Sequence, residues 1–368
     1  MKQIAHKYRI YPDTEQVELL AKTFGCVRVV WNNILDWRSK EYTLNAVKIN
    51  YFASSKKLTE IKRLEELAWL NEVSCIALQQ ALRCQDAAFS NFFAGRAKYP
   101  NFKSKHGKQS FRLTSSGFRI KDNLLYIAKS KNPLKIALSR PLPSQINSLT
   151  ISKDCSGRYF ASFQGESQKE QLPKLNNSIG LDVGLNHFLT TSNGEKIDNP
   201  RIYRKNEKRL KVLQRRLSRK AKGSNNRNKA RLKVARHHAT ITNSRKDFLH
   251  KLSTKLIREN QTIIVEDLNV IGMLKNHNLA KSISDASWSE FSRMLKYKAD
   301  WHNRTFTKVS RWLPSSQICS SCGHRGSKKA LSVREWVCSE CGAIHDRDIN
   351  AAKNINTAGQ AEINDCQI

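Results

Sequence analysis

Four cysteines near the end of the chain have the spacing of a metal site. The pairs CSSC and CSEC are separated by 15 residues, and they supply Cys319, Cys322, Cys338 and Cys341. This C-x2-C-x15-C-x2-C spacing is typical of a zinc ribbon, because each pair directs two thiolates at one ion and four thiolates complete its tetrahedron. His324 and His345 lie close by in the sequence, but four thiolates leave no position for either. We therefore predict a structural Zn²⁺ site that folds a small ribbon over residues 315–345 and does no chemistry itself.

Three carboxylates occur at positions where strands and a helix could bring them together. Asp182 lies inside the apolar run IGLDVGL, where a carboxylate is costly unless a cation or hydrogen-bond donors meet it. Glu266 ends the apolar run IIVE, and Asp348 lies at the start of the last predicted helix. Two neighbouring acids have ordinary explanations: Asp267 could be a surface charge, and Asp346 lies where a helix N-cap would. Any one of these acids alone would more often be structural than catalytic.

The elements around these acids favour a catalytic role. Residues 178–198 predict strands joined by an Asn-Gly turn, and TIIVEDL at 262–268 predicts a buried strand. Helical patterns lie on either side of that second run, one of them at 287–302. A strand near 305–310 and the helix DRDINAAKNI complete the series. One acid in the first strand, one after the long helices and one on the last helix is the layout of an RNase H-like fold.

A fold of this kind gathers its carboxylates at one edge of the sheet, where they bind two divalent ions. Such a pair can activate water and stabilise the leaving oxygen of a phosphodiester, and Mg²⁺, or Mn²⁺, suits carboxylate ligands. Asp348 rather than Asp346 is the predicted third ligand, because its helix face would pack on the sheet. Ala352 and Ile355 lie on that face. The predicted site is therefore a two-metal phosphodiesterase made of three carboxylates.

The first half of the chain predicts a strand, a helical block and further strands. Residues 3–11 alternate like a strand that ends at Pro12, and Asp13 with Gln16 resembles a capping box. Apolar stripes then continue at helical spacing to about Gly95, which predicts about four helices. Strand-like pieces follow at 124–128, 149–152 and 159–164. We interpret them as a small β-barrel or sheet to which the first strand returns.

The chain is strongly basic. It has 368 residues, with 65 Lys and Arg against 31 Asp and Glu, and a formal net charge of +34. A polyanion is the natural partner for such an excess, and nucleic acid is favoured over a membrane surface. Residues 201–236 alone contain 16 basic residues and one acid, Glu207, with a break at Gly223. This predicts a basic helical hairpin within 200–259 that contacts phosphates, since a solvated helix with so much positive charge would repel itself.

The sequence contains no evident targeting or membrane segment. The N-terminus MKQIAHKYRIYP lacks the apolar core of a signal peptide, and no run of about 18 apolar residues occurs. The nine cysteines include five outside the two pairs, and these five follow no framework of a secreted, disulfide-bonded fold. We expect a soluble protein of a reducing, cytoplasmic compartment with no membrane partner.

Taken together, the motifs resemble those of TnpB, the OrfB family of insertion sequences, which is related to the type V CRISPR effector nucleases. The resemblance extends from about residue 5 to residue 358. Its pieces are, in chain order, KYRIYP, WL at 69–70, LQQAL at 78–82, NFKSK at 101–105, IGLDVGL, IIVEDL, SSQICSSCG, CSECG and DRDINAAKNI. The motifs from IGLDVGL onward are specific when taken together, whereas KYRIYP or LQQAL alone is weak.

The resemblance implies a transposon-encoded, RNA-guided DNA endonuclease. In that family a guide RNA from the transposon end pairs with target double-stranded DNA beside a short motif, and a RuvC-type domain cuts the opened strands. The family's catalytic carboxylates match Asp182 in LDVG, Glu266 in VEDL and Asp348 in DRDIN, and none is substituted. We expect a monomer that acts at the nucleoid of a prokaryotic cell.

The resemblance also divides the chain into parts. A wedge-like β-barrel would comprise 1–12 and 100–170, interrupted by a helical recognition domain at 13–99. A RuvC-like nuclease domain would comprise 176–314 and 346–368, with the zinc ribbon inserted between these two pieces. The whole would be a multidomain α+β protein.

Candidate nucleic-acid contacts follow from the resemblance and from the basic segments. The barrel and the helical block would read the short motif, and Gln79 and Gln80 could bond an adenine edge, although a solvated helix face explains them equally well. Phosphate contacts are predicted for Lys103, Lys105, Arg215, Arg216, Arg219, Lys220, Arg227, Lys229 and Arg231. Phe102, Phe111 and Phe118 could stack on bases, but the barrel core is the expected place for at least two of them.

Two other functions are compatible with the same motifs. A zinc-containing RNA- or DNA-binding regulator that does not cleave would be favoured by an incomplete triad, and here the triad is complete. A DDE-like transposase uses the same fold to join DNA strands, but its triad usually ends in Glu where this chain has Asp348.

Overall fold

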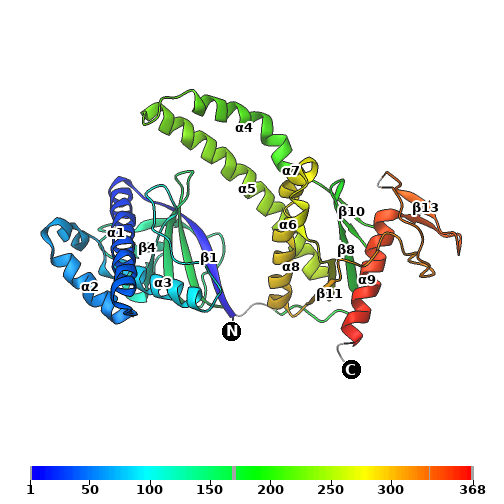
Figure 1. Ribbon diagram of the computed structural model, residues 1–368, viewed down its shortest axis with the longest axis horizontal. Helices are drawn as coiled ribbons and strands as arrows, with labels where there is room; N and C mark the ends of the chain where they lie inside the picture. The colour runs from blue at the N-terminus through cyan, green and yellow to red at the C-terminus, as the bar shows by residue number, and fades with distance from the viewer. Residues whose placement is uncertain (1, 168–170, 331, 366–368) are drawn as a thin grey trace. The chain divides into compact units, whose positions relative to one another are not determined.

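The computed structural model describes residues 2–167, 171–330 and 332–365, and it divides the chain into two compact units. The first unit spans Met1–Gln168 and the second spans Lys169–Ile368. Each unit has its own sheet, its own covering helices and its own hydrophobic core (Figure 1). Each is therefore described by itself.

The first unit is built on an antiparallel sheet. Its described strands are β1 (Lys2–Tyr11), β2 (Gln109–Thr114), β3 (Phe118–Lys121), β4 (Leu124–Ile127), β5 (Leu134–Ala137), β6 (Gln145–Lys153) and β7 (Tyr159–Ser167). They lie in the order β2-β6-β7-β1-β5-β4-β3. The first strand thus returns to the middle of the later ones, as predicted. The sheet is barrel-like, but its edge strands β2 and β3 do not pair with each other in the described residues.

The sequence does not predict β2, β3 or β5, because these short strands mix basic and polar residues with few apolar ones. Their inward side chains are nevertheless part of the core. Phe111 is buried, and the ring of Phe118 packs 6.0 Å from that of Phe163. Phe102 is 61% exposed. Two of the three phenylalanines are therefore core residues, which confirms the expectation.

Helices cover this sheet. The helical segments between β1 and β2 are α1 (Thr14–Asn45), α2 (Tyr51–Arg63), the 3₁₀ helix η1 (Glu65–Glu72) and α3 (Cys75–Phe93). The predicted capping box begins α1: the Asp13 side chain accepts the Gln16 backbone N–H, and the Gln16 side chain accepts that of Asp13. The predicted block of about four helices is therefore three α-helices and one 3₁₀ helix, and it ends at Phe93. Phe24 and Leu78 pack into the same core as Phe111.

The second unit contains a mixed sheet. Its described strands are β8 (Ser178–Val183), β9 (His187–Thr191), β10 (Lys196–Asp198), β11 (Thr262–Glu266) and β12 (Thr305–Val309), in the order β10-β9-β8-β11-β12. β8, β11 and β12 run parallel, whereas β9 and β10 are antiparallel to their neighbours. All five strands were predicted, because their apolar runs are bounded by clear turn residues.

Helices cover both faces of this second sheet. They are α4 (Ile202–Ser218), α5 (Asn225–Glu259), α6 (Val270–Met273), α7 (His277–Ala286), α8 (Trp288–His302) and α9 (Arg347–Asp365). α5 and α8 contribute to the core that contains Ile263 and Val265 of β11. α9 packs on Ile264, which lies between these two residues in the sequence and therefore points to the opposite face. The sheet therefore has α5 and α8 on one face and α9 on the other (Figure 1). The sequence predicts the helical hairpin, α8 and α9, but not α6 or α7, which are short.

A small ribbon is inserted between β12 and α9. It contains strands β13 (Glu335–Val337) and β14 (Ile344–Asp346), which pair antiparallel. No helix in the described part of the chain is long and apolar enough to cross a membrane.

Candidate active site and metal centre

Asp182 and Glu266 are neighbours at one edge of the second unit's sheet. β8 and β11 run parallel, and their register pairs Leu181 with Val265. The next residues along the two strands are Asp182 and Glu266. Adjacent strands lie about 4.8 Å apart and their paired residues point to the same face, so the two carboxylates share one face of this edge.

Helix α9 brings Asp348 to the same place. Gly180 lies so close beneath the helix that an added Cβ would stand 2.2 Å from the Ala352 carbonyl oxygen. Asp182 lies two residues beyond Gly180 on the strand, and Asp348 lies one turn before Ala352 on the helix. Residues two apart on a strand and four apart on a helix share a face, so the helix presents Asp348 beside Asp182.

The three carboxylates line one cavity of about 510 Å³. Among the described residues, no hydrogen-bond donor or ion-pair partner contacts the carboxylate of Asp182 or of Glu266. Burial, followed by the negative charges of Asp348 and Glu266, raises the pKa of Asp182 to about 8, while Arg347 acts in the opposite direction. Burial also raises the pKa of Glu266. A cavity of unpaired oxygen ligands is suited to a cation, which would favour the ionised form of both groups.

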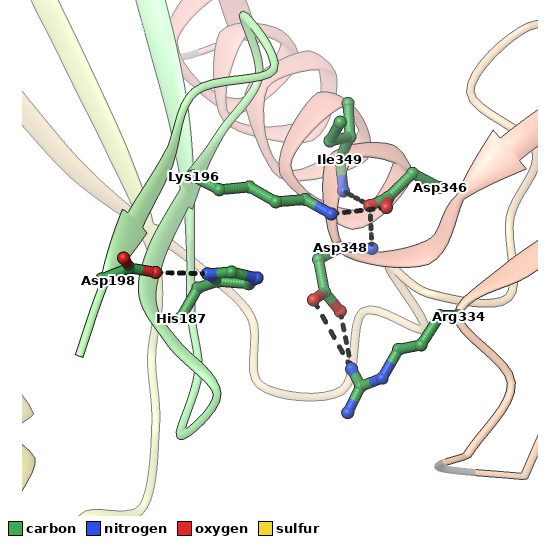
Figure 2. A network of polar contacts seen from close by, with 7 residues as sticks. All are labelled: His187, Lys196, Asp198, Arg334, Asp346, Asp348 and Ile349. Atoms are coloured by element: carbon green, nitrogen blue, oxygen red, sulfur yellow. Dashed lines mark hydrogen bonds and ion pairs between the residues drawn. The ribbon is translucent and has the colours of Figure 1, made fainter.

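Asp346 caps helix α9 and does not line this cavity. Its carboxylate accepts the backbone N–H groups of Asp348 at 3.1 Å and Ile349 at 3.0 Å, and it accepts Lys196 Nζ at 2.6 Å (Figure 2). Although burial acts to raise it, these bonds hold the pKa of Asp346 below its usual value. Asp346 therefore fixes the start of the helix that carries Asp348, as an N-cap does.

Asp267 forms surface ion pairs, in line with its interpretation as a surface charge. Its carboxylate accepts Lys308 Nζ at 2.9 Å and also bonds Arg311. These hydrogen bonds lower the pKa of Asp267. It therefore differs from the adjacent Glu266, whose carboxylate has no such partner among the described residues.

Arginines line the cavity together with the carboxylates, and the sequence analysis does not find them. Arg334 of the ribbon lies with its Nη1 atom 3.4 Å from Asp348 Oδ1, as Figure 2 shows. Arg311, Arg325 and Arg347 also line the cavity. Arg347 could have been found, because it lies between two acids already singled out. No feature of the sequence points to Arg334, because a cysteine pair separates it from Asp348.

The four cysteines of the ribbon converge on one point. Their Sγ atoms all lie within 4.8 Å of one another, and the closest contacts, Cys319 to Cys341 and Cys322 to Cys338, are 3.7 Å. A disulfide would be about 2.05 Å long. Four sulfurs held about 2.3 Å from a tetrahedral ion stand about 3.8 Å apart, so the spacing fits a metal site.

The surroundings of the cysteines orient them. Gly323 and Gly342, both at positive φ, donate their N–H groups to the carbonyls of Cys319 and Cys338, so the two pairs form equivalent turns. His345 Nε2 lies 3.0 Å from Cys319 Sγ, and its ring packs on Trp336. His345 therefore contacts the cluster without belonging to it.

The ribbon is anchored to the helix that carries Asp348. Asn350 and Asn354 of α9 each donate a hydrogen bond of 2.7 Å to the Ile318 carbonyl. Ser320 N–H donates to the Asn350 side chain at 2.9 Å. The cysteine cluster and the carboxylate cavity are therefore parts of one connected structure.

The candidate nucleic-acid residues are mostly exposed. On α3, Gln79 is exposed but Gln80 is buried. Lys105 is exposed, whereas the Lys103 ammonium lies 3.7 Å from the centre of the Trp31 ring. The exposed cations of the α4–α5 hairpin are Arg215, Arg216, Arg219, Lys220, Lys229 and Arg231. Arg227 differs, because it donates to the carbonyls of Leu217 and Lys220 and closes the hairpin turn.

Three family models match parts of the chain. One described as "Probable transposase" (OrfB_IS605) matches residues 162–277, and one described as "Cas12f1-like, TNB domain" matches 288–355. A third, described as "Helix-turn-helix domain", matches residues 1–46. The described part of that last segment is strand β1 and the single helix α1, so it contains no turn between two helices.

A relative identifies the family. A protein of Streptomyces pristinaespiralis named as an RNA-guided DNA endonuclease is 50% identical over 98% of this chain and 91% of its own length. The chain belongs to the TnpB family. InsQ of Escherichia coli, also named as an RNA-guided DNA endonuclease, is 31% identical over 98% of this chain and 94% of its own. A TnpB-like protein of Acanthamoeba polyphaga mimivirus is 24% identical over 96% of this chain and 73% of its own.

Solved structures share the fold of this TnpB chain. A Cas12f1 protein, solved in complex with single guide RNA and target DNA, matches 94% of this chain and 83% of its own with a TM-score of 0.57 and 14% identity. The mini-RNA-guided endonuclease CRISPR-Cas phi3 matches 97% of this chain and 92% of its own with a TM-score of 0.54 and 10% identity. At these identities the likeness concerns the fold alone.

Proposed function

We propose that this protein is a transposon-encoded, RNA-guided DNA endonuclease whose second unit is an RuvC-like, RNase H-like nuclease. The observation that carries the proposal is the meeting of Asp182, Glu266 and Asp348 in one cavity, although 166 residues separate the first from the third in sequence. The strand order β10-β9-β8-β11-β12 with a helix on the acidic face supports the fold assignment. Membership of the TnpB family supports guidance by RNA and action on DNA.

The three carboxylates fit divalent metal ions. Asp182 and Glu266 have oxygen atoms that no described donor occupies, and Asp348 has two long contacts to Arg334, of 3.4 and 3.5 Å. These three residues would bind Mg²⁺ or Mn²⁺. Two such ions supply activation of water and stabilisation of the leaving oxygen of a phosphodiester. The arginines that line the same cavity would attract the phosphate and orient the strand against the carboxylates.

The rest of the chain would bind the two nucleic acids. The exposed cations of the α4–α5 hairpin would contact phosphates of the guide RNA or the target strand. The first unit would serve as a wedge-like barrel with a helical recognition domain, and exposed Gln79 is its candidate for reading a base edge. We propose that the protein acts as a monomer on DNA in the cytoplasm of a prokaryotic cell.

The nuclease assignment is tested by removing one carboxylate at a time. Asp182→Ala and Glu266→Ala should each lower Mg²⁺-dependent cleavage of guide-matched DNA at least about a hundredfold, because the ions lose a ligand. Binding of the copurified RNA should be retained. Asp198→Ala is the matched control, since this acid belongs to the same sheet but its side chain is 94% exposed and has His187 as its single polar partner among the described residues (Figure 2). Cleavage at the wild-type rate by the Asp182→Ala protein would overturn the assignment.

We also propose that the four cysteines bind one structural Zn²⁺. The cysteine thiols and the spacing of their sulfurs fit this ion, and four protein ligands leave no open position for catalysis. Cys338→Ser should lower the bound zinc from one equivalent to a small fraction and make residues 315–345 sensitive to protease. Cys155→Ser, at an exposed cysteine of the first unit, should change neither. Full zinc content in the Cys338→Ser protein would contradict the proposal.

A further inference from the structure

A second cavity adjoins the carboxylate cavity, and the proposed function does not use it. It has a volume of about 530 Å³, within the range of about 300–1,000 Å³ that is usual for small-molecule sites. Glu266 and Val183 line both cavities, so both spaces reach the same edge of β8 and β11. All residues that line the second cavity belong to the second unit.

The second cavity has an apolar and aromatic wall. Trp288 and Phe291 of α8 and Phe306 of β12 line it, together with Val265 and Leu268. Flat, polarisable rings next to aliphatic side chains form the kind of surface on which nucleobases stack, whatever their sequence. The wall therefore suits an aromatic ligand better than a phosphate or a sugar.

Polar groups of the same cavity are placed to receive a base. Trp288 is 5% exposed, and its indole N–H has no acceptor among the described residues. A buried donor without an acceptor is costly, and the nitrogen and carbonyl groups of a nucleobase would supply one. The hydroxyls of Ser292 and Thr307 line the cavity as well.

The cations at this cavity are suited to a nucleic-acid strand. Arg293, Lys296 and Lys308 line it, against the single acid Glu266. Arg293 is paired with Glu290, and Lys308 with Asp267. Lys296 is exposed and has no ion-pair partner in the described part of the chain, so it is available to a phosphate.

We propose that this cavity binds the base of a substrate-strand nucleotide beside the scissile phosphate, which rests on the proposed function of the adjoining carboxylates. The strand would lie with its phosphate in the carboxylate cavity, and one base would turn out of the stack into the aromatic cavity. Turning a base out of a single strand costs little, and stacking on the partly exposed ring of Phe306 offsets that cost. The base would therefore hold the phosphate in register with the carboxylates.

The proposal is tested with the wild-type ribonucleoprotein and guide-matched DNA that carries one abasic site at successive positions around the cut. Loss of the base should slow cleavage about 5- to 150-fold at one position next to the cut and much less elsewhere, while target binding is retained. This measurement needs no protein variant. Equal rates at every abasic position, from a protein that cuts intact DNA, would overturn the proposal.

A variant links that effect to the cavity. Ser292→Tyr should fill the space and slow cleavage of intact DNA by a similar factor, and the sensitive abasic site should then cause no further loss. Ser284→Tyr is the matched control, because this exposed serine on α7 lies outside the cavity. An undiminished abasic effect in a folded Ser292→Tyr protein would also overturn the proposal. Absence of cleavage by the wild-type protein would instead overturn the proposed function itself.

Discussion

Burial without pairing distinguishes two carboxylates of the proposed site, Asp182 and Glu266, from other acids of the second unit. The Asp285 side chain is also buried, yet it accepts the N–H of Tyr203 and pairs with Arg245. Asp346 and Asp267 likewise have several donors each. Asp182 and Glu266 have none among the described residues. A stable fold satisfies buried charges, so unsatisfied ones indicate a ligand that neutralises them.

A buried lysine gives a pH-dependent prediction away from the carboxylates. Lys298 is 7% exposed, and burial lowers its pKa to about 8, although it donates to His250, Ser253 and Thr254. The folded state therefore binds the proton less tightly than the unfolded chain, in which the pKa is about 10.4. The buried positive charge of Lys298 therefore lowers the free energy of unfolding at neutral pH, and this loss should be recovered as the pH rises from about 8 toward 10.

The test compares wild type with Lys298→Met by chemical denaturation. The stability of the wild type relative to the variant should increase by about 2 kcal/mol between about pH 7 and about pH 10. Lys296→Met controls for loss of an exposed lysine from the same helix. A relative stability that falls over this interval would contradict the burial argument.

At the scale of elements, the sequence predicts the second unit better than the first. The strands that carry Asp182 and Glu266 are continuous apolar runs, and the two cysteine pairs have a spacing of their own. β2 and β3 are harder to predict, because each is short and has only two large apolar residues among basic and polar ones, such as Phe111 and Leu113 in β2. The burial of Gln80 likewise depends on tertiary packing, so no local pattern predicts it. The Arg334 contact and the aromatic cavity arise only from folding, so no local pattern reveals them.

The close contact between β8 and α9 also has a testable consequence. Gly180→Ala would push α9 away from β8, because the added Cβ would lie 2.2 Å from the Ala352 carbonyl oxygen and 2.6 Å from the Asn356 nitrogen. We expect a loss of about 1–3 kcal/mol in the free energy of unfolding, with an additional loss of cleavage because Asp348 moves from Asp182. Gly25→Ala, which meets nothing within 4 Å, should not destabilise. Wild-type stability and cleavage in Gly180→Ala would show that the helix adjusts freely.

At the scale of the whole molecule, the net charge of +34 is concentrated where nucleic acid is expected. The hairpin contains a large share of it, with its cations exposed on α4 and α5. Two acids of this hairpin are paired: Glu207 with Lys211 and Lys281, and Asp247 with Lys251. This distribution favours a surface that binds phosphates, as proposed above, over an even coat of charge.

The salt dependence of RNA binding measures that surface. Replacing Arg215, Arg216 and Arg219 together by Gln should weaken binding and reduce the slope of log affinity against log salt by up to about 2, since each lost phosphate contact removes about 0.7. Lys251→Gln, at an exposed lysine already paired with Asp247, should leave the slope unchanged. An unchanged slope in the triple variant would remove the hairpin from the proposed interface.

Guidance by RNA is the central claim, and exchanging the guide tests it most directly. The protein would be purified with its RNA, the variable segment of that RNA replaced by an unrelated sequence, and the cut sites mapped on DNA that contains both targets beside varied flanking sequences. We predict that cutting moves to the DNA that matches the new segment, requires Mg²⁺ and is lost in the Asp182→Ala protein. Cutting that stays at the old sites whatever the RNA, or wild-type protein that cuts neither target, would contradict the account.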